Sequence, residues 1–394
     1  MGLGRTGINR RLAEIAFSSA IYNVGFYLGT SLMILYLVGL GYSPFLAGVL
    51  LAVSKLVYSI AMMTTGALSD RMGRKVPIVW GFAMTGAALV GMGLLTNMAA
   101  EAVLLLVVWL GYAFQGPAAS AAVSDFALAG KTAIGFGWFY MLLSGGQVIG
   151  QALAGATAQG YGYPATLIFG GAVSLASIAL LTRYVDRRPK TEGARLDFLG
   201  DLRHGLSLVR SDDRLANLIA GISLHTLGFQ MFYTYIPLVA VVDQGLSDSS
   251  IGFLLAVFSG GAALSVFAFG VVTSRIGGLR MLVWHLALSS LVWWVYPYLS
   301  GYGSLVALMA VMGVIGAMDM PARRELLSYI SEGEVGTAMG ALDSISMTVG
   351  SLGVLAAGAL WNLGHWVPFV TSAVVNAVGI IFLLNVRMRS RAQA

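Results

Sequence analysis

Long apolar stretches alternate with short polar ones along almost the whole chain. Each stretch reaches about 20 residues, the length that a helix needs to cross the hydrocarbon core of a bilayer. Six of them fill the first half, near residues 12–40, 44–69, 76–96, 102–124, 135–160 and 163–183. Six more follow a polar interval, near 215–241, 249–274, 280–299, 304–327, 335–362 and 365–386. The pattern predicts an all-α membrane protein with twelve transmembrane helices.

Composition supports lipid as the solvent. Of 394 residues, 58% are hydrophobic and 10% are charged, which is more apolar surface than a water-soluble globule can bury. The first apolar stretch is too long for a cleaved secretion signal and leads directly into the second. The chain has no cysteine, which excludes disulfides and thiolate metal sites.

The chain also repeats itself at an offset of half its length. The segment Gly66-Ala-Leu-Ser-Asp-Arg-Met-Gly-Arg-Lys75 returns 204 positions later as Gly270-Val-Val-Thr-Ser-Arg-Ile-Gly277. Gly48 returns as Gly252, and Pro117 as Pro321. We therefore expect two pseudo-symmetric six-helix bundles, residues 1–185 and 215–394.

A polar linker, residues 186–214, joins the expected bundles. Its apolar residues are spaced as on one face of a helix: Leu196, Leu199, Leu202, Leu206 and Val209. The linker is predicted to be either a short amphipathic helix on the membrane surface or a plain tether.

Basic residues gather on one side of the predicted membrane. All but Lys55 of the 23 Lys and Arg residues fall in the termini, the linker, and the loops and adjoining helix ends of a single face. The loops of the opposite face carry Glu101, Asp243 and Asp248 and no basic residue. The positive-inside rule therefore places both termini in the cytoplasm, and we expect a prokaryotic inner membrane. This topology explains the pI of about 9.5 without nucleic acid as a partner.

The two six-helix halves, the central loop and the stretch Gly66–Lys75 resemble the major facilitator superfamily of secondary transporters. The resemblance covers the whole chain. It implies a cavity between the halves that opens alternately to each side, with the substrate near the bilayer midplane.

The same resemblance, together with the charges of the motif, predicts a cytoplasmic gate. Glycines permit a tight turn, Asp70 can accept hydrogen bonds from the first amides of the helix near 335–362, and Asp125 resembles the acidic partner of the basic residues. The expected gate residues are Gly66, Asp70, Arg71, Gly73, Arg74, Lys75, Asp125 and, in the degraded second copy, Arg275. Alternatively, these charges only mark the cytoplasmic interface.

Three charged residues inside predicted helices are candidates for function. Lys55 is too deep to reach the outer surface easily, so it either attracts an anion in the translocation path or snorkels. Asp319 is either a proton-coupling carboxylate or the partner of Arg323, four residues later. Asp343 is either a second coupling carboxylate or a structural partner of Arg323 or Arg324.

Polar side chains without a formal charge complete the predicted path for substrate and protons. Each either joins two helices through a hydrogen bond or contacts the substrate, and the histidine could also titrate near neutral pH. They are Asn23, Gln115, Gln147, Gln151, His225 and Gln230.

Covalent catalysis has no support, because the sequence contains no P-loop, no Gly-x-Ser-x-Gly and no His-Glu-x-x-His. We expect no enzyme activity and no cofactor. Three functions remain open: a proton-coupled exporter of amphipathic compounds, an uptake symporter or uniporter for a small organic anion, and a non-transporting sensor or lipid-handling protein. The compact loops favour export, although the Gly-Pro pair typical of drug antiporters is missing near Gly145. The expected partners are a small-molecule substrate, protons and the bilayer, and the chain is expected to act as a monomer.

Overall fold

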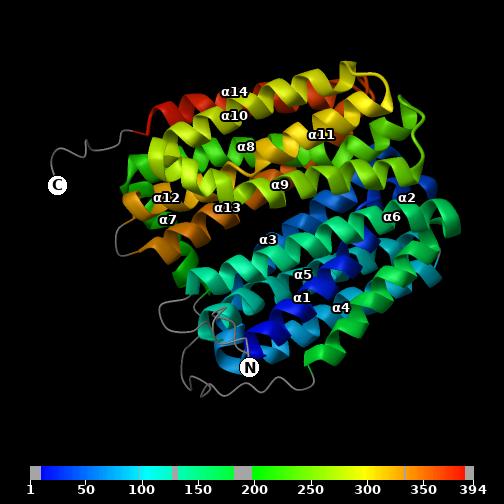
Figure 1. Ribbon diagram of the computed structural model, residues 1–394, viewed down its shortest axis with the longest axis horizontal. Helices are drawn as coiled ribbons and strands as arrows, with labels where there is room; N and C mark the ends of the chain where they lie inside the picture. Colours follow the sequence, from blue (N-terminus) through cyan, green and yellow to red (C-terminus); the bar gives the residue numbers. More distant parts are fainter. Residues whose placement is uncertain (1–9, 96, 127–131, 182–197, 332–333, 387–394) are drawn as a thin grey trace. The chain divides into compact units, whose positions relative to one another are not determined.

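The computed structural model describes residues 10–95, 97–126, 132–181, 198–331 and 334–386 (Figure 1). All elements in these ranges are helical. Eleven of the described helical segments are long and apolar enough to cross a membrane. One of them contains Gly162, whose φ of 80° and ψ of 167° are not helical, so this segment makes two passes. The described ranges therefore hold twelve passes.

The first half contains α1 (Arg10–Thr30), α2 (Met33–Gly39), α3 (Pro44–Met72), α4 (Lys75–Leu94), α5 (Met98–Phe126), α6 (Thr132–Ala176) and the short 3-10 helix η1 (Ser177–Leu181). The second half contains α7 (Phe198–Ser211), α8 (Asp213–Val242), α9 (Asp248–Ile276), α10 (Gly278–Val295), the 3-10 helix η2 (Tyr296–Tyr298), α11 (Tyr302–Gly316), α12 (Asp319–Ile330), α13 (Val335–Trp361) and α14 (Val367–Leu384). Helix α7 occupies the part of the linker where the leucine spacing predicts a helix.

Two helices that the apolar pattern predicts as continuous are broken. The stretch 12–40 divides into α1 and α2, where the Ser31 hydroxyl donates to the carbonyl of Tyr27 at 2.5 Å in addition to the backbone N–H of Ser31. The stretch 304–327 divides into α11 and α12 at residues 317–318. Here Pro321 has no N–H to donate to the carbonyl of Ala317, as a continuous helix would require.

The structure divides into two compact units. Unit 1 comprises residues 1–42, 53–196 and 245–260, and unit 2 comprises 43–52, 197–244 and 261–394. The start of α3 thus belongs to the unit built mainly from the second half of the chain, and the start of α9 belongs to the other. The units therefore differ from the predicted bundles by these two helix starts.

Glycines at equivalent positions of the repeat allow close packing in each unit. A Cβ on Gly48 would lie 3.2 Å from the carbonyl oxygen of Val354 in α13, within unit 2. A Cβ on Gly252 would lie 2.7 Å from the Cα of Gly155 in α6, within unit 1. Gly73 and Gly277, also 204 positions apart, both turn the chain with positive φ, 84° and 88°. The repeat is therefore present in backbone geometry as well as in sequence.

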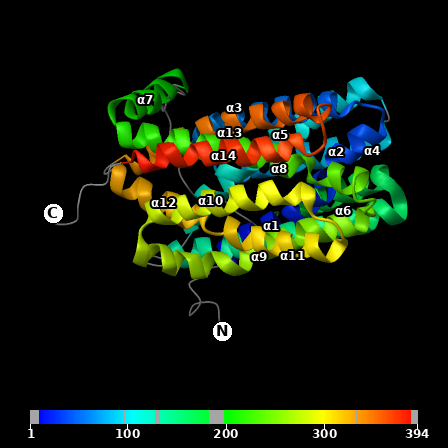
Figure 2. The same ribbon diagram turned by 90° about the horizontal axis from the view of Figure 1, so that it is seen from above.

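Within unit 2, α8 packs against α13 and α14, and α10 packs against α14 and α12. Helices α10 and α14 run side by side in both views (Figures 1 and 2). Aromatic rings fill the space between α8, α10 and α14, with Phe232 stacked on Trp293 at 5.4 Å and packed edge-on against Phe369 at 5.3 Å. This rigid core holds the polar residues of the next section.

Candidate functional site

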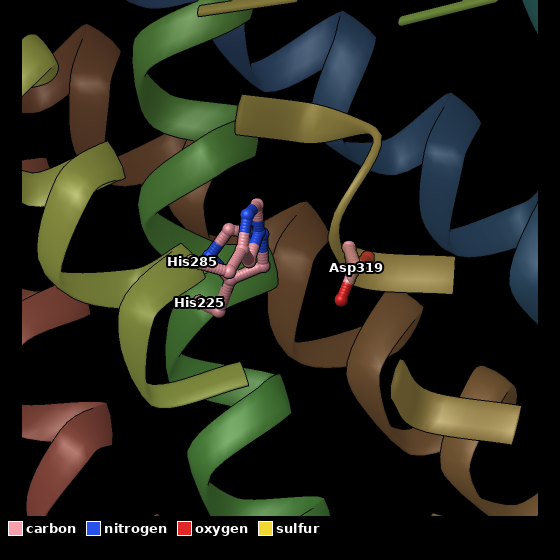
Figure 3. Close-up of side chains that lie close together, drawn as sticks. All are labelled: His225, His285 and Asp319. Atoms are coloured by element: carbon pink, nitrogen blue, oxygen red, sulfur yellow. The ribbon is translucent and has the colours of Figure 1, made fainter. Parts of the chain in front are cut away.

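A group of polar side chains lies inside unit 2, close to its aromatic core. His225 comes from α8, His285 from α10, and Asp319 from the first residue of α12 (Figure 3). One nitrogen of each imidazole and one oxygen of the carboxylate all lie within 4.8 Å of one another. The two histidines are 5% and 2% exposed, so they are held away from bulk solvent. We call these three residues the histidine–aspartate site.

Fixed hydrogen bonds orient both imidazole rings. His225 Nδ1 lies 2.9 Å from Asn376 Oδ1, and His285 Nδ1 lies 2.9 Å from the carbonyl oxygen of Ile315. The remaining nitrogens, the two Nε2 atoms, face each other at 3.2 Å. Trp293 stacks on the His225 ring at 5.5 Å and limits its movement.

Asp319 links the histidines to a cation. The Nε of Arg323 donates to Asp319 Oδ1 at 2.5 Å, so the i,i+4 pair predicted as the structural alternative is formed. The guanidinium of Arg323 places a positive charge beside the Asp319 carboxylate, which faces the histidines. This charge disfavours a divalent cation at the site, because such an ion would compete with Arg323 for the same carboxylate. A single proton is more compatible with the local charge.

Asp343 lies on α13, near the basic end of α12. Its side chain is exposed, and Arg323 and Arg324 are close enough to act on it electrostatically. This is the setting expected for a structural partner of these arginines, although the coupling role remains a prediction.

Lys55 lies in unit 1 among aromatic side chains. Its Nζ is 5.6 Å from the ring centroid of Trp109 in α5, within the range of a cation–π interaction. Tyr58 and Tyr112 pack around the same indole, at 5.8 and 6.1 Å. Lys55 is half-buried. The cation therefore lies over an indole that is itself packed among two tyrosine rings.

The turn between α3 and α4 and the residues beside it carry four of the expected gate residues: Arg71, Gly73, Arg74 and Lys75. Arg74 Nε donates to Asp125 Oδ2 at 2.8 Å, and its Nη1 donates to Ser69 Oγ at 2.7 Å, all within unit 1. Arg71 and Gly73 are half-buried, and Arg275 is exposed at the end of α9. Lys75 is half-buried at the start of α4. The side chains of Gly66 and Asp70 lie outside the described residues, so a bond from Asp70 to α13 remains a prediction.

The uncharged residues of the predicted path are spread over both units. Asn23 Nδ2 donates to the carbonyl of Leu143 in α6 at 3.2 Å, which is the bond between helices that was the alternative to substrate contact. Gln147 Nε2 donates to Ser259 Oγ at 3.0 Å. Gln115 and Gln151 are buried, and Gln230 is half-buried. Of the uncharged residues of the predicted path, His225 belongs to the histidine–aspartate site within unit 2.

Several polar partners escaped the sequence analysis. His285 and Asn376 contact His225 from 60 and 151 positions away, and no local motif marks either of them. Glu101, predicted in a loop, instead lies fully buried in the first turn of α5. Tyr36 donates to its Oε1 at 2.5 Å. A tyrosine within an apolar stretch gives no sign of such a distant acceptor.

Comparisons with known proteins extend these observations. A family model described as Major Facilitator Superfamily matches residues 15–247 and 218–394. The chain is 22% identical over 381 residues to the quinolone resistance protein NorA of Staphylococcus aureus (strain MSSA476), and the alignment covers 96% of each chain. A solved structure of a POT family transporter in complex with 5-aminolevulinic acid is similar with a TM-score of 0.79, at 11% identity and 95% coverage of each chain. A bacterial homolog of the human lysosomal transporter Spinster, inward-facing and unoccupied, has a TM-score of 0.71 at 13% identity, covering 95% of this chain and 94% of that one. At these identities the solved structures show a shared fold.

Proposed function

Because the chain belongs to the major facilitator superfamily, we propose that it is a proton-coupled exporter of aromatic, amphipathic organic compounds. The family and the apolar helices make it an integral membrane transporter. Export, coupling and substrate class are the proposal. We further propose that it resides in a bacterial inner membrane with both termini in the cytoplasm, as the distribution of basic residues predicts.

The observation that carries the proposal of export is the alignment with the quinolone resistance protein. It runs over 96% of both chains, so it is not confined to a shared segment. The short loops that connect the helices of this chain agree with a compact exporter. Resistance to quinolones is a property of that relative, and it motivates the choice of probe below.

The chemistry around Lys55 supports an aromatic substrate that carries a negative charge. Its ammonium group lies over Trp109, and Tyr58 and Tyr112 pack against that indole. Aromatic rings provide stacking surface, and a half-buried cation favours a carboxylate over a neutral group. Quinolones combine a flat ring system with a carboxylate, so they match both features.

Coupling to protons is supported by Asp319 and by the absence of a nucleotide-binding motif in the sequence. With no P-loop, the energy for accumulation has to come from an ion gradient. Asp319 is a carboxylate within the apolar segment Tyr302–Ile330, where ionisable groups are costly and generally serve a function.

Everted membrane vesicles test export directly. The vesicle lumen is acidified, and uptake of an intrinsically fluorescent quinolone is followed with and without a protonophore. We expect accumulation that collapses when the pH gradient is removed. Asp319→Asn should abolish accumulation, whereas Asp213→Asn, which removes a charge from an exposed position of the same unit, should not. The proposal fails if the flux of every aromatic probe is insensitive to the protonophore.

Uptake of a small organic anion is the second candidate, because the cation of Lys55 also favours it. Right-side-out vesicles placed in an acidic medium distinguish import from export. Uptake of a carboxylate probe in these vesicles, with no accumulation in everted ones, would favour import over export.

A further inference from the structure

The hydrogen bonds around His225 and His285 determine where their protons must be. The carbonyl oxygen of Ile315 can only accept, so His285 Nδ1, 2.9 Å away, carries a hydrogen. Asn376 Nδ2 donates to the carbonyl of Leu286 at 2.8 Å and to Ser290 Oγ at 2.9 Å. These bonds orient the amide so that its Oδ1 faces His225 Nδ1, which therefore also carries a hydrogen.

This assignment leaves the two Nε2 atoms in conflict. A neutral imidazole carries one hydrogen, so with both Nδ1 atoms protonated each Nε2 has a bare lone pair. The two Nε2 atoms lie 3.2 Å apart in a buried setting. Two bare lone pairs at that distance repel each other, whereas one added proton turns the contact into an N–H···N hydrogen bond.

The surrounding groups compensate the charge of that proton. Asp319 of α12 presents a carboxylate oxygen within 4.8 Å of both histidine nitrogens. Arg323, on the same helix, forms an ion pair with Asp319, and its positive charge disfavours the added proton. Asp343 of α13 interacts electrostatically with both Arg323 and Asp319. Helix α11 contributes the Ile315 carbonyl, and the α14 segment Val367–Leu384 contains no ionisable residue. Asp319 therefore decides whether the added charge is stable.

We propose that the His225–His285 pair binds one exchangeable proton between its two Nε2 atoms, with Asp319 as its counter-charge. On binding, the proton forms an N–H bond to one Nε2, and the lone pair of the other Nε2 accepts the hydrogen bond. On release the same N–H bond breaks, and both lone pairs stay on their nitrogens. The role of this proton in transport rests on the proposed function, but its presence in the pair does not.

Nitrogen NMR tests the proton site without any substrate. The chain has four histidines; His204 is exposed, and His365 is half-buried and paired with Asp243, so replacing both by glutamine leaves only the histidines of the pair. The protein is labelled with ¹⁵N-histidine and studied in detergent micelles. At pH 7 we expect signals of three protonated nitrogens, the two Nδ1 atoms and one Nε2, for one bare Nε2. Two bare Nε2 signals from about pH 5 to 8 would overturn the proposal.

Asp319→Asn provides a second variant that leaves both rings in place. Removing the counter-charge should make the pair release its proton at a pH lower by about one unit or more. The control Asp213→Asn, at an exposed position, should leave the NMR titration unchanged. An unchanged titration in Asp319→Asn would refute the role of the carboxylate. Stoichiometric zinc in the purified protein, absent from His285→Gln, would instead identify a metal site and overturn the proton assignment.

The vesicle assay then connects the site to transport. His225→Gln and His285→Gln should each abolish accumulation of the quinolone but preserve exchange of probe down its own gradient. If both variants still accumulate the probe, the pair is not the coupling site. If the wild-type protein moves no probe, the proposed function fails, while the NMR result still decides the proton site.

Discussion

Replacing Asp125 by asparagine is expected to destabilise the protein strongly. Arg74 Nε lies 2.8 Å from Asp125 Oδ2, and the two side chains are only 8% and 7% exposed. The asparagine leaves the charge of Arg74 buried, with the neutral hydroxyl of Ser69 as a hydrogen-bond acceptor at 2.7 Å. Removing one partner of a buried ion pair costs about 3–5 kcal/mol.

The same reasoning predicts a different outcome when the whole pair is removed. The double variant Arg74→Met with Asp125→Leu buries no charge, so it should lie within about 1 kcal/mol of the native protein or be more stable. The pair Arg10 and Glu14 serves as the exposed control, with side chains 72% and 18% exposed. Glu14→Gln should cost about 0.5 kcal/mol or less.

Equilibrium unfolding in mixed detergent and sodium dodecyl sulfate micelles, followed by circular dichroism, measures all four proteins. The reasoning is refuted if Asp125→Asn costs less than about 1 kcal/mol, because loss of the carboxylate removes a close ion pair from a buried guanidinium. It is also refuted if the double variant is as unstable as the single one. Either result would mean that water or another protein group compensates the charge of Arg74.

Three further predictions concern packing, pH and binding. Gly252→Ala places a Cβ 2.7 Å from backbone atoms of α6 and should clearly lower the melting temperature. The control Gly270→Ala adds its Cβ in open space, so it should leave the stability unchanged or raise it by up to about 1 kcal/mol. Hydrogen bonds from Arg214 lower the pKa of Asp212, the N-cap of α8. The stability that the ionised Asp212 contributes is therefore complete above its unfolded pKa of about 3.9 and is lost as the pH falls through the folded value. Asp212→Asn should be less stable than the native protein at pH 7, and unfolding measured at pH 7 and at acidic pH should show this difference closing on acidification. Lys55→Met should weaken binding of a quinolone at least tenfold but leave binding of its decarboxylated analogue unchanged, as measured by equilibrium dialysis; equal weakening for both would exclude a charge contact.

The sequence predicted much of the fold because bilayer constraints act locally. Every span has to be apolar and satisfy its own backbone hydrogen bonds, so the segments can be read one at a time. The breaks at residues 31–32 and 317–318 were missed, since they depend on a back-bonding serine and on a proline whose effect lies four residues earlier. Gly162, where the backbone leaves helical geometry, lies between the predicted stretches 135–160 and 163–183.

For the sites, sequence reasoning succeeded where partners are close along the chain or belong to a known motif. The contact of Asp319 with Arg323 follows from a four-residue spacing, and the motif placed Arg74 near Asp125. The environment of Lys55 was predicted only as cavity or lipid surface. Its place over Trp109 depends on how α3 packs against α5, which no residue pattern within either helix specifies.

The sequence by itself determined that lipid is the solvent, that the structure is duplicated at an offset of 204 residues and that few charges lie inside the membrane. Only the tertiary structure decided which of those polar groups meet. His225, His285 and Asn376 lie on three different helices, and their contacts depend on the rotation of each helix about its axis. That rotation is set by packing of the aromatic core between them, where many weak contacts act together and no short segment of sequence carries the answer.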